Sequence, residues 1–252
     1  MIQKIFLVVI VIFFVASYFL RGIFMDLFNK QTNPMLAHQA EEYYSDSVSI
    51  KIASAIQKDD IDLLEDLVKS PDFKPEDHGK RDVSLILWAA SLDNINAISV
   101  LIKAGVPVDD VMVFNRINMN MVSIAVSSRN PEFLKILLDE GANPNGVGDT
   151  EAPLITAIFA KRWDRFDLLI NKGADIEKQD DAGVTPLIQL ALVSEYEQVL
   201  KLLKLGANPE HKTILGMSLR TVIDKFPLDL SSEAGKAQQS VVDFLKKNNS
   251  QG

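Results

Sequence analysis

The sequence predicts an all-α repeat solenoid of about five to six units, because one short pattern recurs at a nearly fixed spacing. Four stretches share an apolar pair or near-pair, a glycine and a small or polar turn: LIKAGVPVD (101–109), LLDEGANPN (137–145), LINKGADIE (169–177) and LLKLGANPE (202–210). The glycines of these stretches are separated by 36, 32 and 33 residues: Gly105, Gly141, Gly173 and Gly206. A period in this range is typical of stacked supersecondary units.

Each unit is expected to hold two short helices. Fifteen residues before each glycine an apolar run ends, at Ala90, Val126, Ile158 and Ala191. The unit is therefore predicted to run through a short helix, a tight turn, and a second helix closed by the glycine. Glycine suits that end because it adopts the positive φ of a helix C-terminus without strain. A finger-like connection then leads to the next unit.

The two ends of the array are expected to differ from the middle, as terminal repeats must close the core. In the first unit the same spacing pairs Ala55 with Ser70, where the glycine is replaced. GMSLRTVIDKF, from 216 on, begins a sixth unit. In the last predicted helix, Val241, Val242 and Leu245 face inward, whereas Lys, Gln and Asn cover the outside. These are degenerate capping units.

The unit at 180–210, DDAGVTPLIQLALVSEYEQVLKLLKLGANPE, resembles the ankyrin repeat. It keeps six positions of the family pattern: Asp180, Gly183, Thr185, Pro186, Leu187 and Ala191. It departs from the pattern where Ile188 replaces the family's histidine. The resemblance covers roughly residues 47–247. A tetratricopeptide or HEAT-like solenoid is the alternative, but those repeats lack this glycine register.

The N-terminal stretch is apolar and without charge from Ile5 to Leu20, between Lys4 and Arg21. We interpret residues 1–22 as a retained signal anchor, which is slightly short for a bilayer span. The alternative is a cleavable signal peptide ending at Ser17. Residues 23–46 are expected to form a juxtamembrane linker with a short helix and a solvated Glu-Glu-Tyr-Tyr face, followed by a repeat domain over 47–247 and a disordered tail over 248–252.

Either reading of the N-terminus places the repeats outside the cytoplasm. The anchor predicts a single-pass protein of a bacterial inner membrane with its repeat domain in the periplasm. Cleavage predicts a soluble periplasmic protein.

The composition excludes several function classes. The formal net charge is −8 and no run of basic residues exceeds two, so the footprint of a nucleic-acid-binding protein is missing. Cysteine is absent, which excludes disulfides and thiol catalysis. His38, His78 and His211 have no partner at metal-ligand spacing. The acidic pairs at 59–60 and 180–181 are read as helix-start and turn residues. We expect no catalytic residue, metal or cofactor, and therefore no enzyme.

The resemblance implies that a protein partner docks on finger tips and on the exposed edge of each first helix. Carried onto this sequence, the candidate binding residues are Leu92, Met119, Phe159, Leu192, Val193 and Met217, with Ile214 and Leu215 nearby. The second finger, from Gly105 to Asn120, is longer than the later ones and is expected to project Val111, Met112 and Phe114. Such an apolar set indicates a recognition patch. The alternative is that the repeat stack buries these side chains.

The sequence therefore predicts a membrane-tethered, extracytoplasmic module that binds another protein and is monomeric when unbound. Its architecture resembles exported bacterial ankyrin proteins that act as immunity proteins, which block a secreted toxic enzyme such as a lipase effector. The alternative is a periplasmic helper of an envelope enzyme such as catalase.

Overall fold

The computed structural model describes residues 39–80, 83–114, 117–148 and 152–249. They fall into two compact units, an N-terminal unit up to Leu168 and a C-terminal unit from Leu169. The apolar segment at 5–20 and His38 lie outside the described residues, as does the end of the predicted tail. Within the described ranges, no helix combines the length and the apolar character that a membrane span requires.

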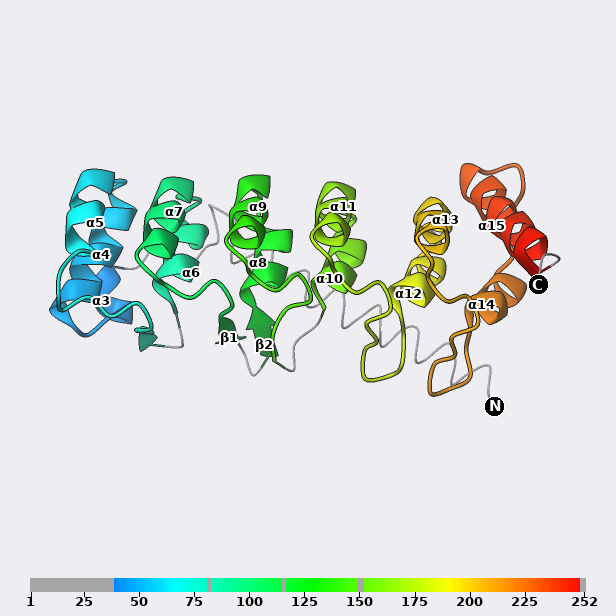
Figure 1. The fold of residues 1–252 in the computed structure, drawn as a ribbon, viewed down its shortest axis with the longest axis horizontal. Coiled ribbons are helices and arrows are strands. Elements are labelled where there is room, and N and C mark those ends of the chain that lie inside the picture. Colours follow the sequence, from blue (N-terminus) through cyan, green and yellow to red (C-terminus); the bar gives the residue numbers. More distant parts are fainter. Residues whose placement is uncertain (1–38, 81–82, 115–116, 149–151, 250–252) are drawn as a thin grey trace. The chain divides into compact units, whose positions relative to one another are not determined.

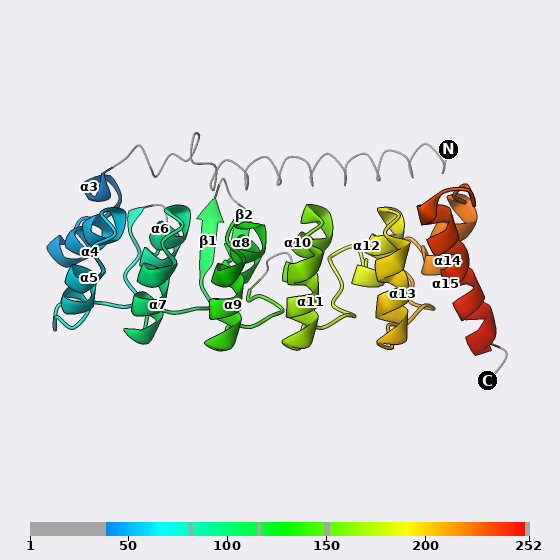
Figure 2. The same cartoon turned by 90° about the horizontal axis from the view of Figure 1, so that it is seen from above.

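The N-terminal unit consists of one single-turn helix followed by helix pairs, as the period predicts. Its elements are α3 (Ala40–Tyr43), α4 (Ser47–Gln57), α5 (Ile61–Leu67), α6 (Leu85–Ser91), α7 (Ile95–Lys103), β1 (Val111–Phe114), β2 (Ile117–Asn120), α8 (Met121–Ser127), α9 (Pro131–Asp139) and α10 (Pro153–Ala160). Helix α11 (Trp163–Asn171) begins in this unit. Figures 1 and 2 both show α4 beside α5, α6 beside α7, and α8 beside α9.

Local signals explain where these helices start and stop. Side chains of Ser, Asp or Asn precede most of them and accept a hydrogen bond from a first-turn amide, as Asn94 does from Ala97 N at 3.0 Å. Such caps satisfy donors that the helix itself leaves free. In four repeats, the turn between the two helices contains a residue with positive φ: Asp59, Asp93, Lys161 and Ser194.

Stacking of the pairs buries a continuous apolar core in this unit. Ile98, Leu101, Leu134 and Leu137, which lie on the second helices, are fully buried. Neighbouring first helices are also tied by polar contacts, since Thr156 Oγ1 in α10 donates to Ser123 Oγ in α8 at 3.3 Å. One pair could not bury these faces alone, which is why the array is needed.

An aromatic cluster closes the start of the array. Tyr43 and Tyr44 pack on Trp88 of α6, with ring centroids 5.4 and 6.1 Å apart. Trp88 Nε1 donates to Ala53 O in α4 at 3.0 Å, and Tyr44 Oη donates to Val83 O at 3.1 Å. The expectation of a solvated tyrosine face is wrong, because both rings are buried and only the two glutamates before them are exposed. The described end of the predicted linker is thus attached to the repeats.

The second finger contains a hairpin that the sequence analysis did not predict. Strands β1 and β2 pair antiparallel, with Val111 opposite Asn120 and Phe114 opposite Ile117. The surplus length of this finger therefore forms a two-stranded ribbon rather than a simple loop. The elements on either side of the ribbon, α7 and α8, are helices.

The C-terminal unit holds two further helix pairs. They are α12 (Pro186–Leu192) with α13 (Tyr196–Lys204), and α14 (Leu219–Lys225) with α15 (Glu233–Asn249). Val241 and Leu245 of α15 are buried as predicted, and Val242 is half-buried. Gln238 was expected on the polar outside but is buried. It faces inward because its amide bonds Tyr196 Oη at 2.9 Å and Phe226 O at 3.0 Å.

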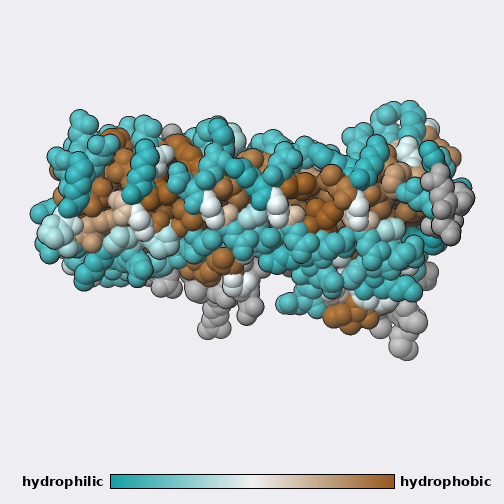
Figure 3. Space-filling model, in the orientation of Figure 1, coloured by the Kyte–Doolittle hydropathy of each residue, from teal (hydrophilic) through white to brown (hydrophobic). Residues whose placement is uncertain are grey.

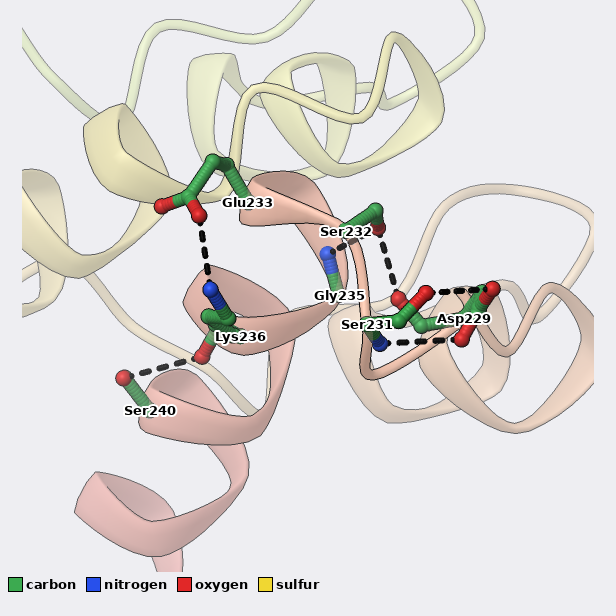
Figure 4. Close-up of polar contacts among 7 residues, drawn as sticks. All are labelled: Asp229, Ser231, Ser232, Glu233, Gly235, Lys236 and Ser240. Atoms are coloured by element: carbon green, nitrogen blue, oxygen red, sulfur yellow. Dashed lines mark hydrogen bonds and ion pairs between the residues drawn. The ribbon is translucent and has the colours of Figure 1, made fainter.

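A tight turn leads into α15 (Figure 4). Asp229 accepts hydrogen bonds from Ser231 N at 2.9 Å and from Ser231 Oγ at 2.7 Å, and these bonds lower the pKa of its carboxyl group. Ser232 Oγ accepts from Gly235 N at 3.0 Å and so caps the helix. A Cβ added at Gly235 would lie 2.0 Å from Asp229 O, so this close approach requires glycine.

Candidate functional site

The fingers begin at the four glycines that set the period. Gly105, Gly141, Gly173 and Gly206 have φ values of +93, +90, +88 and +96°. The helix end is closed in each case by a bond from the next amide back to the helix, such as Ala142 N to Leu137 O at 2.9 Å. Each of these glycines thus lies in a turn with positive φ directly after a helix.

Two pairs of adjacent fingers are joined by a carboxylate at an equivalent position. In the N-terminal unit, Asp109 Oδ1 accepts from Asn143 N at 2.9 Å. In the C-terminal unit, Glu177 Oε1 accepts from Asn208 N at 2.6 Å. Each acceptor stands four residues after its glycine, and each donor stands two residues after the next one. Fingers are therefore held to one another as well as to their own helices.

The fifth finger, residues 206–218, ends in a tight turn with two large apolar residues at its tip. Thr213 O accepts from Gly216 N at 2.8 Å, and Thr213 N donates to Met217 O at 2.9 Å. The side chains of Ile214 and Leu215, between them, are 76% and 69% exposed. Figure 3 shows the resulting apolar patch at the tip of the connection between α13 and α14.

The fourth finger, residues 173–185, makes the same turn with different chemistry at its tip. Gly183 N donates to Asp180 O at 2.9 Å, and Asp180 N donates to Val184 O at 3.1 Å. The Asp180 carboxylate also accepts from Ala182 N and Val184 N. Asp181 and Ala182 occupy the two tip positions. The acidic pair at 180–181 is therefore confirmed as part of a turn.

A polar hollow of about 610 Å³ lies in the N-terminal unit, between the start of α4 and residues 71–80. Ser49 Oγ donates to Asp77 Oδ2 at 2.9 Å. Asp46 caps α4 by accepting from Val48 N and Ser49 N. Burial acts to raise the pKa of Asp46, but hydrogen bonds with Ser49, Asp77 and Val48 together hold that pKa below its usual value. These bonds cap α4 and connect it to the segment at 71–80 within the first repeat.

The histidines in the described part of the chain each face one neighbouring finger. His211 Nε2 lies 2.9 Å from Gly183 O, and His78 Nε2 lies 3.5 Å from Asp110 Oδ2. Over the described ranges, no group of three or more His, Cys, Asp or Glu side chains is arranged to hold a metal ion. These contacts connect fingers.

Comparison with known proteins agrees with the repeat geometry. A family model described as ankyrin repeats, in three copies, matches residues 122–213. These residues are ankyrin repeats.

Curated relatives and solved structures extend the comparison. The chain is 27% identical over 157 residues to a mitochondrial disaggregase of Bos taurus, and 30% identical over 114 residues to the putative ankyrin repeat protein FPV024 of fowlpox virus. These matches cover 59% and 44% of this chain but only 21% and 19% of the relatives. The chain thus spans about a fifth of the length of the curated relatives it matches.

Two solved structures show the same fold at low sequence identity. An ankyrin repeat domain from Acinetobacter baumannii AYE superposes with a TM-score of 0.61 at 22% identity, and the human ASB11 ankyrin repeat domain with 0.53 at 16%. Both matches cover 75% of this chain and 96% of the other chain. Ankyrin repeats are typically protein-interaction scaffolds without catalytic activity.

The candidate binding residues differ in their exposure. Ile214 and Leu215 are exposed, as a recognition patch requires. Six others are half-buried: Leu92, Val111, Phe159, Leu192, Val193 and Met217. The side chains of Met112 and Phe114 lie outside what the structure describes. The expected exposure of Met119 is wrong, because its side chain is only 4% exposed. At Met119 the stack buries the side chain, which was the stated alternative.

Arg165 of α11 is a functional-looking residue that the sequence analysis missed. Its buried guanidinium donates to Val126 O near the end of α8 and to Arg129 O at 3.3 Å. Burial lowers the pKa of Arg165, and the nearby charge of Arg162 adds to this effect. The contacts satisfy carbonyls at a helix C-terminus, so the role is structural. The aromatic residues Trp163 and Phe166 close to it in sequence were the available signal.

Proposed function

We propose that this chain is a non-enzymatic protein-binding module that an N-terminal anchor holds at a bacterial inner membrane, with its repeats in the periplasm. The partner that best fits this architecture is a secreted toxic enzyme, which the module would bind and block as an immunity-type inhibitor. Binding of a protein partner is also the usual task of ankyrin repeats.

The observation that supports binding is a constant frame with changing outer residues. The fourth and fifth fingers make the same turn through bonds at Asp180 and Thr213, yet one carries Asp-Ala at its tip and the other Ile-Leu. A surface whose outer residues vary without altering the backbone can be matched to one partner. Connections outside a rigid scaffold commonly carry binding residues.

Polar side chains on these connections support a non-enzymatic role. Asp109 and Glu177 join fingers, and Asp180 closes a turn. Each carboxylate is thereby committed to the fold. A general acid or base would need a carboxylate aimed at a space where substrate could sit.

The support for the tether is the uncharged run at 5–20, followed by Arg21. Burial of such a run is driven by apolar transfer and does not weaken with salt, unlike attachment through charge. The full-length protein should therefore stay with membranes after washing with high salt and with alkaline carbonate. Release by either wash, or a mature N-terminus near Tyr18, would contradict the anchor.

The binding function is tested by capture with the full chain from a detergent extract of its own cells. Proteins retained at near-equal stoichiometry are identified by mass spectrometry, purified and assayed with and without the module. A captured secreted hydrolase whose activity falls on addition supports the inhibitor proposal. A captured envelope enzyme whose activity is preserved or raised favours the helper role instead. If the purified chain retains no protein at such stoichiometry, the binding proposal fails.

A further inference from the structure

We propose that the fifth finger is a peg that inserts Ile214 and Leu215 into an apolar cavity, with a neutral or basic rim, on a protein partner. The inference rests on the proposed protein-binding function and narrows it to two side chains and one kind of receiving surface.

The peg is held rigidly by its own turn and by the neighbouring finger. Ile214 N donates to Ala182 O at 3.1 Å, and Met217 N donates to Thr213 Oγ1 at 3.1 Å. Below the tip, His211 Nε2 lies 2.9 Å from Gly183 O. The backbone that carries the two side chains is therefore already ordered. Preorganisation of this kind lowers the entropy that binding must overcome.

The fold does not require large apolar residues at the tip. The fourth finger places Asp181 and Ala182 at the two equivalent positions and makes the same backbone bonds. At 76% and 69% exposure, Ile214 and Leu215 contribute little buried area to their own unit. The turn of the fourth finger therefore serves as a natural comparison for the turn of the fifth finger. The apolar pair is explained by a contact that the free chain does not make.

The size of the peg indicates a cavity rather than a flat surface. Two adjacent side chains cover far less than the roughly 800 Å² per partner that a stable interface buries. Contact between two identical pegs could not hold a dimer by itself. Side chains that contribute strongly to binding usually fill well-packed, desolvated pockets on the partner.

Charges around the peg favour a protein over a lipid surface. Asp181 and Glu210 are exposed on the two joined fingers, against one exposed lysine, Lys212. An excess of carboxylates disfavours approach to an anionic bilayer, whereas apolar lipid-binding segments usually carry Lys or Arg. The same excess of carboxylates is complementary to a partner surface whose cavity has a neutral or basic rim.

The test compares three full-length chains: the natural protein, the double variant Ile214→Asp/Leu215→Ala, and the control Leu205→Ala, which changes an exposed apolar side chain of the same unit outside the finger tips. The double variant copies the residues of the fourth finger, so the turn is expected to fold. Circular dichroism and melting temperature check that all three chains fold alike. The first probe is the purified protein that the natural chain captures from its own cells. The second is vesicles of phosphatidylcholine and phosphatidylglycerol at about 4:1.

A photo-crosslinking residue placed at 215 locates the receiving surface directly, and the same residue placed at 205 is its control. We expect the double variant to bind the captured protein at least about tenfold more weakly, with the control within about threefold of the natural chain. We also expect the crosslink from 215 to end among apolar residues flanked by uncharged or basic ones.

Other outcomes separate the two proposals. A folded double variant that binds the captured protein as well as the natural chain overturns the peg but leaves the binding function intact. Because the proposed anchor would hold every full-length chain on the vesicles, lipid contact is measured at the tip, and a crosslink from 215 to lipid overturns the protein partner in favour of lipid. Crosslinks that end in an acidic or polar surface overturn the stated rim. If no protein is captured, the binding function fails, and the peg fails with it.

Discussion

The two ends of the repeat array are closed by different chemistry. At the start, Tyr43 and Tyr44 cover Trp88, so that three aromatic rings shield the first helices from water. At the end, the side-chain amide of Gln238 makes the main closing contacts. Gln238 Oε1 accepts from Leu228 N at 2.8 Å, while its Nε2 donates to Tyr196 Oη.

The difference shows two ways of ending a stack that would otherwise continue. The aromatic end gains stability mainly from apolar area, which tolerates small shifts in geometry. The amide end depends on three directed hydrogen bonds of the buried Gln238 side chain, and losing that side chain removes all three. Substitution at the two ends should therefore differ in size and in additivity.

The largest effect is expected at the aromatic end. Trp88→Ala removes a fully buried side chain together with its bond to Ala53 O, and should lower the free energy of unfolding by about 3–5 kcal/mol. The measurement is chemical denaturation followed by circular dichroism. Leu63→Ala, on the exposed side of α5, is the control and should change stability by less than about 0.5 kcal/mol. Equal effects of the two changes would refute the proposed closure.

A smaller loss is expected at the amide end. Gln238→Leu leaves Leu228 N and Phe226 O without this partner and should cost about 1–3 kcal/mol. Gln239→Leu is the matched control, because the Gln239 amide bonds Asp243 on the exposed side of the same helix. In a double-mutant cycle, Tyr196→Phe should cost less in the Gln238→Leu background than alone. Strict additivity would mean that the amide and the tyrosine act independently.

A substitution in a central repeat gives a stability loss with which the losses at the two ends can be compared. Gly141 has φ of +90°, and no atom lies within 4 Å of a Cβ built there. Gly141→Val should therefore lower stability through backbone strain alone, by more than about 1 kcal/mol. Gly141→Asn should cost less, since Asn tolerates positive φ better. An unchanged melting temperature for the valine variant would count against the repeat register.

The smallest effects concern the two buried tyrosines, one at each end. Burial raises the pKa of both Tyr44 and Tyr196 above the unfolded value of about 10. The folded state thus favours the neutral phenol, so stability is fully present below about pH 10 and is lost as the pH rises further. At neutral pH, each Tyr→Phe change should cost about 1 kcal/mol or less.

Alkaline titration of stability separates the two tyrosines. Tyr44→Phe should flatten the decline above pH 10 more than Tyr196→Phe does. Besides burial, Asp77 and Asp46 oppose ionisation of Tyr44, whereas the bond from Gln238 partly offsets burial at Tyr196. Denaturation curves measured from pH 7 to 11 test this order. A decline that neither substitution changes would show that other groups control alkaline unfolding.

The features that sequence reasoning predicted are those encoded within one repeat. Gly141 and its counterparts could be placed because a helix end, a positive φ and the period all coincide there. The acidic pair at 180–181 could be assigned to a turn for the same reason. The exposed tip at Ile214 and Leu215 follows from its position in the finger.

The features that were missed depend on neighbours distant in the sequence. Tyr44 is separated by 39 positions from Val83, and Gln238 by 42 from Tyr196, so no local pattern reveals that these side chains are buried. Met119 was misplaced because the β-hairpin, whose pairing sets which way each residue faces, carries no turn signature in this sequence.

The contacts of Tyr43 and Tyr44 have a mechanical consequence. If the chain is held at a membrane through residues before 39, as proposed, any pull between partner and membrane reaches the repeats through the segment that holds these two rings. The load then falls first on their contacts with Trp88 and on the bond to Val83 O, before it reaches a finger or a helix pair. Weakening this attachment would lengthen the tether by the residues that are released, while the binding surface stayed intact.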